Sequence, residues 1–366
     1  MLQKYKWTYF SDVDISDCFF DSLKSDYPEF ESWFFRKSIE RKKALVIKSE
    51  SGINAFLYLK RENVEGDVSP LTVNGMCLDN IPRIKIGTLK ISETIRNQRL
   101  GEGAIGVSLW YWAESRYKEI YVTVFDKHDN LISLFLHFGF CNIGHNPRGE
   151  SVLVKKRTPL DFSTPYKAFP FISDKFQKAG LLPIYDKYHD RLFPYSELAK
   201  TNQEVFEETA GNGITKIFLA SPLKQLKYYE GMPIFVYRIC SDKLKKYKSA
   251  ITSFCTITRI TIIKENNAFH CSFENFIKSI GNKSIYKEDE LKTLFLSKRN
   301  LIAIEMLYNG FFGKGHNINF TNLKKIGLFE SYPYEIVYNK CEFIKILEMG
   351  GKNVQDIIID QSATCK

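Results

Sequence analysis

A turn between an apolar strand pattern and a helical pattern is the segment of this sequence best suited to bind a phosphate group. Its core is Gln98-x-x-Gly101-x-Gly103, and Arg96 and Arg99 add positive charge beside it. Glycines let the main chain approach a ligand closely, and the N–H groups of a helix's first turn carry the positive end of its dipole. The turn therefore predicts a pyrophosphate site. The Lys-Ser/Thr pair of nucleoside-triphosphate loops is absent, which argues against a triphosphatase.

Two side chains near this turn are candidates for proton transfer. His128 opens a helical pattern, and an imidazole titrates close enough to neutrality to act as an acid or a base. Glu93 could instead deprotonate an amine through a water molecule. The alternatives are a helix-capping or merely exposed histidine and a solvated loop carboxylate.

A second group of candidate residues lies in the C-terminal half and suits a nucleic acid. Lysines that neutralise phosphates strengthen binding by releasing counterions, and aromatic or guanidinium planes can stack on bases. The candidates are Tyr237, Arg238, Lys243, Lys245, Lys246 and Lys248. The alternative is a solvated lysine-rich turn beside a core tyrosine. No cysteine or histidine spacing suits a metal site, so no metal ligand is predicted.

The elements that must position the first group alternate between helical and strand patterns. Apolar spacing predicts helices over 15–23, 30–40, 101–117 and 128–138. Strands are expected over 44–48, 54–60, 83–91, 120–125, 140–143 and 151–155. The strand over 83–91 carries apolar groups on both faces, as a central strand does. The pyrophosphate turn would thus join a buried strand to a helix.

The second half has strand-rich segments with few helices and no regular strand–helix alternation. Strands are expected over 214–219, 233–239, 251–263 and 300–306, and helices over 273–280 and 287–297. A proline-punctuated stretch is interpreted as a linker. The predicted fold class is mixed α/β, with a first domain over 1–157, a linker over 158–183 and a small-barrel domain with helices over 184–366.

Length and charge bound the remaining possibilities. The chain of 366 residues is long enough for two domains, and its formal charge is +10. Beyond residue 160 there are 29 basic and 22 acidic residues, so most of the excess lies in the second half and favours a phosphate-bearing partner there. No apolar run approaches the roughly 20 residues that span a bilayer, and no signal peptide is evident, so a cytoplasmic protein without membrane contact is expected.

The order of elements around Gln98-x-x-Gly101-x-Gly103, ending in Gly139-Phe140, resembles the GCN5-related N-acetyltransferase family over about 150 residues. The resemblance implies acetyl-CoA as cofactor and direct acetylation of an amine. It places Ile91 and Ser92 against the pantetheine arm. It also implies pyrophosphate contacts from the turn that starts at Gln98, by the main-chain amides of Arg99, Leu100, Gly101, Glu102, Gly103 and Ala104.

Two departures from that family pattern affect the expected chemistry. The segment between Ile91 and Gln98 is about two residues longer than the family's usual spacing. The family's tyrosine, a general acid towards the departing thiolate, is replaced here by Phe135, while His128 stands where the family often has an asparagine that touches the cofactor.

The layout of the second half, a helix, a Gly231 turn and two apolar strands, resembles the PUA-like superfamily and its ASCH members. That resemblance implies nucleic-acid binding, with RNA favoured over DNA. The leading hypothesis is an acetyltransferase whose amine acceptor is on RNA, an aminoacyl-tRNA or a nucleic-acid-associated protein. The alternatives are a catalytically idle CoA-binding domain in a nucleic-acid-binding regulatory protein and a component of a toxin–antitoxin pair. The sequence does not predict an oligomeric state.

Overall fold

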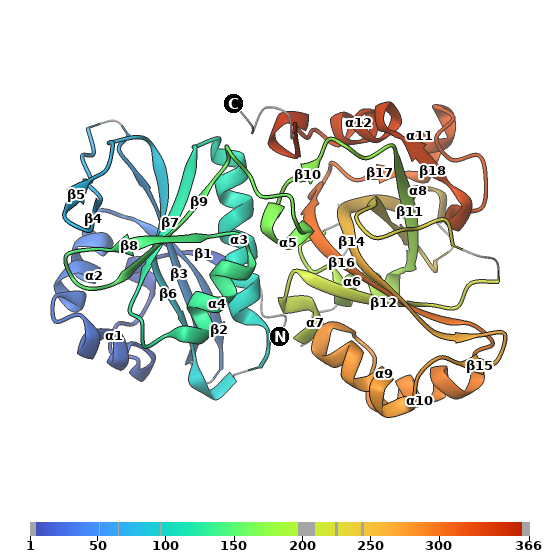
Figure 1. The fold of residues 1–366 in the computed structure, drawn as a ribbon, viewed down its shortest axis with the longest axis horizontal. Helices are drawn as coiled ribbons and strands as arrows, with labels where there is room; N and C mark the ends of the chain where they lie inside the picture. Colours follow the sequence, from blue (N-terminus) through green and yellow to red (C-terminus); the bar gives the residue numbers. More distant parts are fainter. Residues whose placement is uncertain are drawn as a thin grey trace. The chain divides into compact units, whose positions relative to one another are not determined.

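The computed structural model describes residues 5–50, 52–64, 66–95, 97–196, 209–223, 226–242 and 245–360, without the side chains of Thr94 and Lys245. The chain divides into two compact units, Met1–Thr158 and Pro159–Lys366. Each unit is built around its own sheet, which confirms the expected mixed α/β class with two sheet-containing domains (Figure 1). No described helix is long and apolar enough to cross a membrane.

The first unit contains a seven-stranded sheet in the order β1-β2-β3-β6-β7-β9-β8. Its strands are β1 (Lys6–Tyr9), β2 (Lys43–Ser49), β3 (Gly52–Glu62), β6 (Arg83–Ile91), β7 (Glu119–Val124), β8 (Cys141–His145) and β9 (Ser151–Lys156). Two further short strands, β4 (Thr72–Val73) and β5 (Met76–Cys77), pair with each other. All neighbours in the large sheet are antiparallel except β6 and β7, which are parallel.

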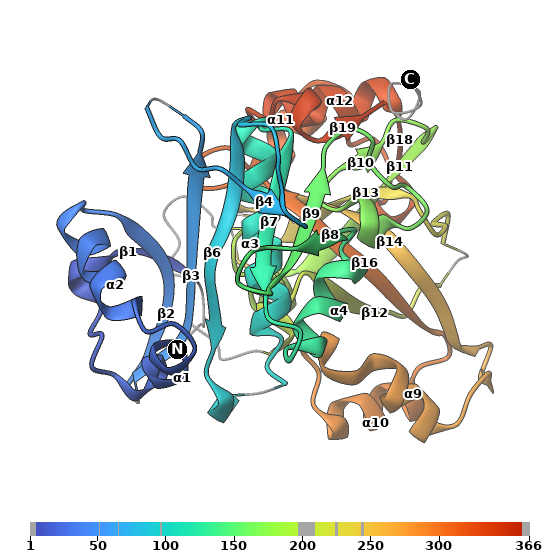
Figure 2. The same ribbon diagram turned by 60° about the vertical axis from the view of Figure 1, so that its left-hand side comes forward.

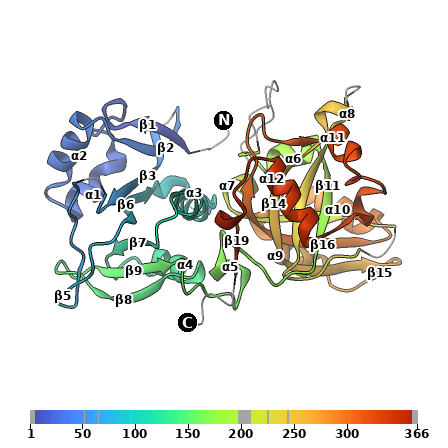
Figure 3. The ribbon, with the colours of Figure 1, turned by 90° about the horizontal axis from the view of Figure 1, so that it is seen from above.

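Helices cover both faces of this sheet. The helices α1 (Asp21–Asp26) and α2 (Phe30–Ile39) lie on one side, and α3 (Leu100–Ser115) and α4 (Asp129–His137) lie on the other (Figure 3). An aromatic cluster packs α2 against β3, with Phe10, Phe34 and Phe56 at its centre. The α3 side is closed by Leu109 and Trp112, which are fully buried. The two apolar layers hold the strand β6 in the middle of the unit.

The second unit has a main sheet in the order β12-β16-β14-β13-β11-β18. These strands are β11 (Lys178–Tyr185), β12 (Thr215–Ala220), β13 (Pro233–Ile239), β14 (Ala250–Glu265), β16 (Leu301–Phe311) and β18 (Val337–Asn339). Two short strands, β15 (Ala268–Phe269) and β17 (Ile318–Asn319), pair with β14. β11 and β13 run parallel, and the other neighbours are antiparallel.

Two apolar clusters cover different parts of this sheet. The first joins it to α11 (Phe320–Lys325) and α12 (Lys340–Met349) through Phe235, Phe343 and their neighbours. The second joins it to α9 (Phe273–Ile280) and α10 (Glu288–Ser297) through Phe276, Phe295 and their neighbours. The two helix pairs lie at opposite ends of the unit (Figure 2). Short helices α5 (Pro165–Ala168), α6 (Asp186–Leu192), α7 (Thr209–Asn212) and α8 (Lys245–Lys248) complete it.

The segment 158–183 differs from the linker expected there. It holds α5, the short strand β10 (Ile172–Ser173), which pairs with β19 (Ile358–Ile359), and most of β11. Because β11 is hydrogen-bonded to strands on both of its sides, the end of this segment, from Lys178, is an interior strand of the second sheet. The prolines were interpreted as a sign of a linker, but Pro183 lies within the strand β11.

Candidate functional site

The strands β6 and β7 separate part-way along β6. Their parallel pairing runs from Arg83↔Glu119 to Ile86↔Val122, whereas β6 continues to Ile91. On its other edge β6 stays paired with β3 as far as Ala55↔Ile91. One edge of residues 87–91 is therefore not paired with β7, at the end of β6 that leads towards α3.

The register indicates which main-chain groups line that edge. Ser92 donates its N–H to the carbonyl of Asn54 at 2.8 Å, so Ser92 is directed towards β3. Along an antiparallel pair, hydrogen-bonding residues alternate with residues directed the other way. The N–H and C=O groups of Leu89 and Ile91 consequently face the edge that β7 has left. Amide groups of an extended ligand arm can pair with such an edge as a strand would.

The α3 helix begins close behind this strand end. The additional residues between Ile91 and Gln98 form a short 3₁₀ turn, Glu93–Ile95, which accounts for the longer spacing noted in the sequence. Arg99 has φ of 58° and precedes the first helical residue, Leu100. The carbonyl of Arg99 accepts the helical bond from Gly103 at 3.1 Å. The amides of the first turn lie N-terminal to that bond, where a helix has no internal acceptors.

Side chains in the same turn are less available than their charges suggest. The Arg99 guanidinium donates two hydrogen bonds to Glu102 Oε2, at 2.9 Å from Nε and 2.6 Å from Nη2. Arg96 lies outside the described residues. Leu100 is buried, and a Cβ at Gly101 would meet Leu134 at an ordinary 3.7 Å. The site therefore depends on main-chain donors and the helix dipole more than on a free arginine.

The two expected proton-transfer residues lie at the same end of β6 and β7. Glu93 is exposed in the 3₁₀ turn, and its charge acts on the ammonium of Lys90. His128 is exposed at the N-cap position of α4 and makes no side-chain capping bond. Phe135 is fully buried and packs edge-on against Phe140 at 4.9 Å, so it is a core residue.

A polar cluster at the end of β7 was not found from the sequence. Asp126 accepts a hydrogen bond from Ser151 Oγ at 2.7 Å, and His145 Nε2 lies 3.1 Å from its other oxygen. These hydrogen bonds, the one from Ser151 first, lower the pKa of Asp126. Nearby, Tyr27 donates to the buried Glu150 at 2.7 Å. The sequence around Asp126 did not indicate this cluster, because its partners Ser151 and His145 come from a hairpin later in the chain.

The candidate nucleic-acid residues of the second unit separate into buried and exposed groups. Tyr237 is 4% exposed and packs against Phe329, so its ring cannot stack on a base. Arg238 is 6% exposed and forms two hydrogen bonds of 2.8 Å with Asp190. Both expectations of base stacking are thus wrong for this conformation, because α6 supplies the carboxylate that holds Arg238.

Part of the lysine cluster lies at the surface. Lys243 and the side chain of Lys245 lie outside the described residues. Lys246 is exposed, and Lys248 is partly exposed with its ammonium 3.2 Å from Asp242. Tyr247, which the sequence reasoning passed over, lies between them in α8 and is 68% exposed. An exposed ring flanked by lysines is the arrangement that single-stranded nucleic acids contact.

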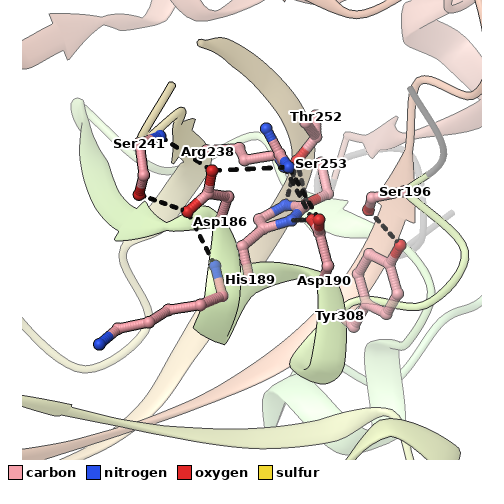
Figure 4. Close-up of polar contacts among 10 residues, drawn as sticks. Asp186, His189, Asp190, Ser196, Arg238, Ser241, Thr252, Ser253 and Tyr308 are labelled. Carbon is pink, nitrogen blue, oxygen red and sulfur yellow. Dashed lines mark hydrogen bonds and ion pairs between the residues drawn. The ribbon is translucent and has the colours of Figure 1, made fainter. Parts of the chain in front are cut away.

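Arg238 instead belongs to a buried network around His189 (Figure 4). The His189 ring has Asp190 2.8 Å from Nδ1 and Thr252 Oγ1 2.7 Å from Nε2. Thr252 lies at a register shift of β14, where the pairing passes from Val236↔Ser253 to Tyr237↔Ile251, and such bulges re-aim side chains. Burial lowers the pKa of His189, and the bonds from Arg238 and His189 outweigh burial to hold the pKa of Asp190 at about 2.

Solved structures of two kinds are similar to parts of this chain. No protein-family model and no curated protein sequence matches it. The N-acetyltransferase PseH of Campylobacter jejuni, solved with acetyl coenzyme A, is 14% identical and covers 42% of this chain and 99% of its own, with a TM-score of 0.28. AtaTR bound with acetyl-CoA is 14% identical over 42% of this chain and 95% of its own, with a TM-score of 0.31.

The second unit has a different kind of neighbour. ASCH from Zymomonas mobilis is 12% identical and covers 46% of this chain and 92% of its own, with a TM-score of 0.29. Solved structures of N-acetyltransferases and of an ASCH protein are each similar to part of the chain. At these identities the likeness concerns the fold alone.

Proposed function

We propose that the first unit is an acetyl-CoA-dependent N-acetyltransferase and that the second unit binds the nucleic acid connected with its acceptor. The acceptor amine would belong to RNA, to an aminoacyl-tRNA or to a protein bound to nucleic acid. The observation that carries the proposal is the loss of β6–β7 pairing beyond Ile86, directly before the first turn of α3. The unpaired edge suits a pantetheine arm and the turn suits its diphosphate.

The chemistry of this arrangement needs little from charged side chains. Holding a neutral amine against a thioester can supply several kcal/mol of the barrier through positioning alone. The contacts assigned to the cofactor are the main-chain groups of Leu89 and Ile91 on the edge that β7 has left and the amides of the turn from Gln98 to Glu102. Ser92, which was expected beside Ile91, donates to Asn54 on β3, and the N–H of Gly103 already donates to Arg99 within α3. His128 and Glu93 remain candidates for proton transfer. Phe135 has no group to protonate the leaving thiolate, so solvent or another residue has to do so.

A catalytically idle CoA-binding unit is the second candidate function. The buried position of Phe135 favours it, because the family's acid is not merely substituted but replaced by a core contact. Both candidates bind CoA, whereas only the enzyme consumes acetyl-CoA. Offering RNA, DNA and protein extracts separately and measuring free CoA thiol distinguishes the two. If no CoA thiol is released with any of the three extracts, the result supports the idle unit.

The cofactor assignment is tested at the two glycines of the turn. Replacing Gly101 and Gly103 together by valine should weaken CoA binding more than 100-fold, because side chains would stand where the diphosphate approaches the main chain. Gly101→Ala is the control for folding, since its Cβ has room beside Leu134. Calorimetry with CoA measures the affinity, and the thermal midpoint reports stability. Unchanged affinity in the folded double variant would contradict the assignment.

The nucleic-acid role is tested at α8. Reversing charge in Lys246→Glu and Lys248→Glu together should weaken binding of single-stranded RNA about tenfold or more at low salt and flatten its salt dependence. The matched control is Lys345→Glu, which reverses an exposed lysine on α12 of the same unit. Fluorescence anisotropy with RNA and DNA of one sequence measures both effects and the preference between them. Equal affinities of the α8 variant and the control would exclude α8 as the contact surface.

A further inference from the structure

The strongest cluster of titratable groups outside the cofactor contacts is the one at the C-terminal end of β7. Asp126 follows the last residue of β7, Val124, by two positions, and Ser151 begins the neighbouring strand opposite Val124. This is the end of β7 nearest to the region where it no longer pairs with β6. The cluster therefore lies at the open end of the β6–β7 pair, on the side of β7 that faces β9.

The geometry of the cluster is that of a base and the residue that orients it. Asp126 uses one oxygen for Ser151 Oγ at 2.7 Å and the other for His145 Nε2 at 3.1 Å. An ionised carboxylate only accepts, so Nε2 donates, and in the neutral ring the lone pair is on Nδ1. Among the described residues, no partner of Nδ1 is found. The His145 and Asp126 side chains are 49% and 65% exposed, so the pair lies at the protein surface.

The main chain at His145 is fixed from both sides. Its N–H donates to Asn74 Oδ1 at 2.9 Å, and its carbonyl accepts from the N–H of Asn74 at 2.9 Å. Gly144 has φ of 129°, and a Cβ there would come within 2.3 Å of the Asn74 amide. Only glycine permits this contact. The pairing of β8 with β9 is also irregular just before His145, and bulges of this kind commonly direct functional side chains.

We propose that His145, oriented by Asp126, is the base that takes a proton from the acceptor amine. The inference rests on the proposed acetyltransferase function. The ammonium of the acceptor gives one proton to His145 Nδ1, which releases it to solvent. The neutral nitrogen then attacks the thioester carbonyl carbon, and the carbon–sulfur bond breaks with its electron pair on sulfur. The second proton from nitrogen passes through solvent to the thiolate, which leaves as CoA. Asp126 is a positioning residue, and Ser151 supports it.

The test compares His145→Gln with a matched variant of the same chain. His270→Gln is the control, because His270 is 47% exposed and lies 4.0 Å from Glu265 in the second unit. The first readout is acetyl-CoA hydrolysis without an added amine, in which water takes the place of the acceptor. We expect the rate to rise with pH in the wild type and in His270→Gln. In His145→Gln it should be at least 30-fold lower, with no such rise.

Asp126→Asn separates orientation from proton acceptance. It should keep CoA affinity and lower the rate less than His145→Gln does, because the imidazole remains but loses its fixed tautomer. Asp126 is a charged group in contact with His145, so removing its charge should shift the pH dependence of the rate in this variant. A wild-type rate and profile in both His145→Gln and Asp126→Asn would overturn the proposal.

A second readout does not require turnover. The ring signal of His145, assigned by its loss in His145→Gln, is titrated by NMR with and without saturating CoA. We expect CoA to shift the midpoint of His145 and to leave that of His270 unchanged. If CoA binds and neither midpoint moves, the inference fails while the cofactor assignment stands. If CoA does not bind the wild-type protein, the proposed function itself fails.

Discussion

The two units each contain a histidine paired with an aspartate, and the pairs differ in almost everything else. His189 is fully buried, both of its ring nitrogens have partners, and Arg238 holds the second oxygen of Asp190 as well as the first. His145 is about half exposed and contacts Asp126 through one nitrogen. The same two residue types therefore stabilise a fold in one unit and offer a lone pair to a ligand in the other.

A structural pair is therefore distinguished from a candidate catalytic pair by whether its hydrogen-bonding groups all have partners, and not by the presence of a motif. In the second unit every ring nitrogen and carboxylate oxygen of the pair is used, so any reaction would first have to break the network. In the first unit the network ends at Nδ1 of His145. Equivalent substitutions in the two pairs test this distinction, because their effects on stability should differ.

The largest difference is expected from removing the carboxylate charge. Asp190→Asn leaves Arg238 buried beside a neutral amide and should cost about 3–5 kcal/mol of unfolding free energy. Asp126→Asn, at an exposed position, should cost less than about 1 kcal/mol. All four tryptophans, Trp7, Trp33, Trp110 and Trp112, belong to the first unit. In Asp190→Asn the second unit should therefore unfold at lower urea when unfolding is followed by circular dichroism. Tryptophan fluorescence, which reports the first unit, should show an unchanged midpoint.

Acid should affect the two pairs in different ways. Burial lowers the pKa of His189 below its ordinary 6.5, so the unfolded chain takes up this proton first and stability falls as the pH drops below about 6.5. The pKa of Asp190 is about 2 against an ordinary 3.8, which removes about 2 kcal/mol more as the pH falls through that interval. Urea titrations between pH 8 and pH 2 measure this loss. His189→Gln should abolish its upper part, and a pH-independent stability would contradict the assignment.

The smallest difference is expected from the hydroxyl partners. Thr252→Val removes the group opposite His189 Nε2 inside the protein and should cost about 1–3 kcal/mol, because a buried polar atom loses its partner. Ser151→Ala also removes a buried hydroxyl, but its partner Asp126 is exposed, so water can replace the lost bond to the carboxylate. Its cost should stay below about 1 kcal/mol. Comparing the two midpoints in urea with that of wild type measures both values, and equal costs would show that exposure is not the deciding factor.

Local patterns predicted most elements of the first unit. The strand expected over 83–91 and the helix expected from 101 are observed as Arg83–Ile91 and Leu100–Ser115, because apolar period and glycine position are local signals. The α3 turn could be named as a candidate site for the same reason. The edge strand β1 and the strand β11 were missed, since one has only four residues and the other contains a proline.

Contacts between distant segments could not be predicted. Arg238 was expected at a surface, but its environment is set by Asp190, 48 residues earlier in the chain. The pair formed by Asp126 and His145 depends on the return of a hairpin and on an irregular register within it. No spacing rule expresses either arrangement. The chemistry at both histidines is therefore a property of tertiary structure.

The way in which α3 meets β6 also bears on how freely this part of the sequence can vary. Every residue type carries the same peptide N–H and C=O groups, so contacts made by Leu89, Ile91 and the amides after Arg99 restrict conformation and leave side-chain identity open. Only positions where a Cβ would obstruct the ligand are confined to glycine. Two proteins could thus hold one cofactor in the same manner with hardly a letter of this segment in common.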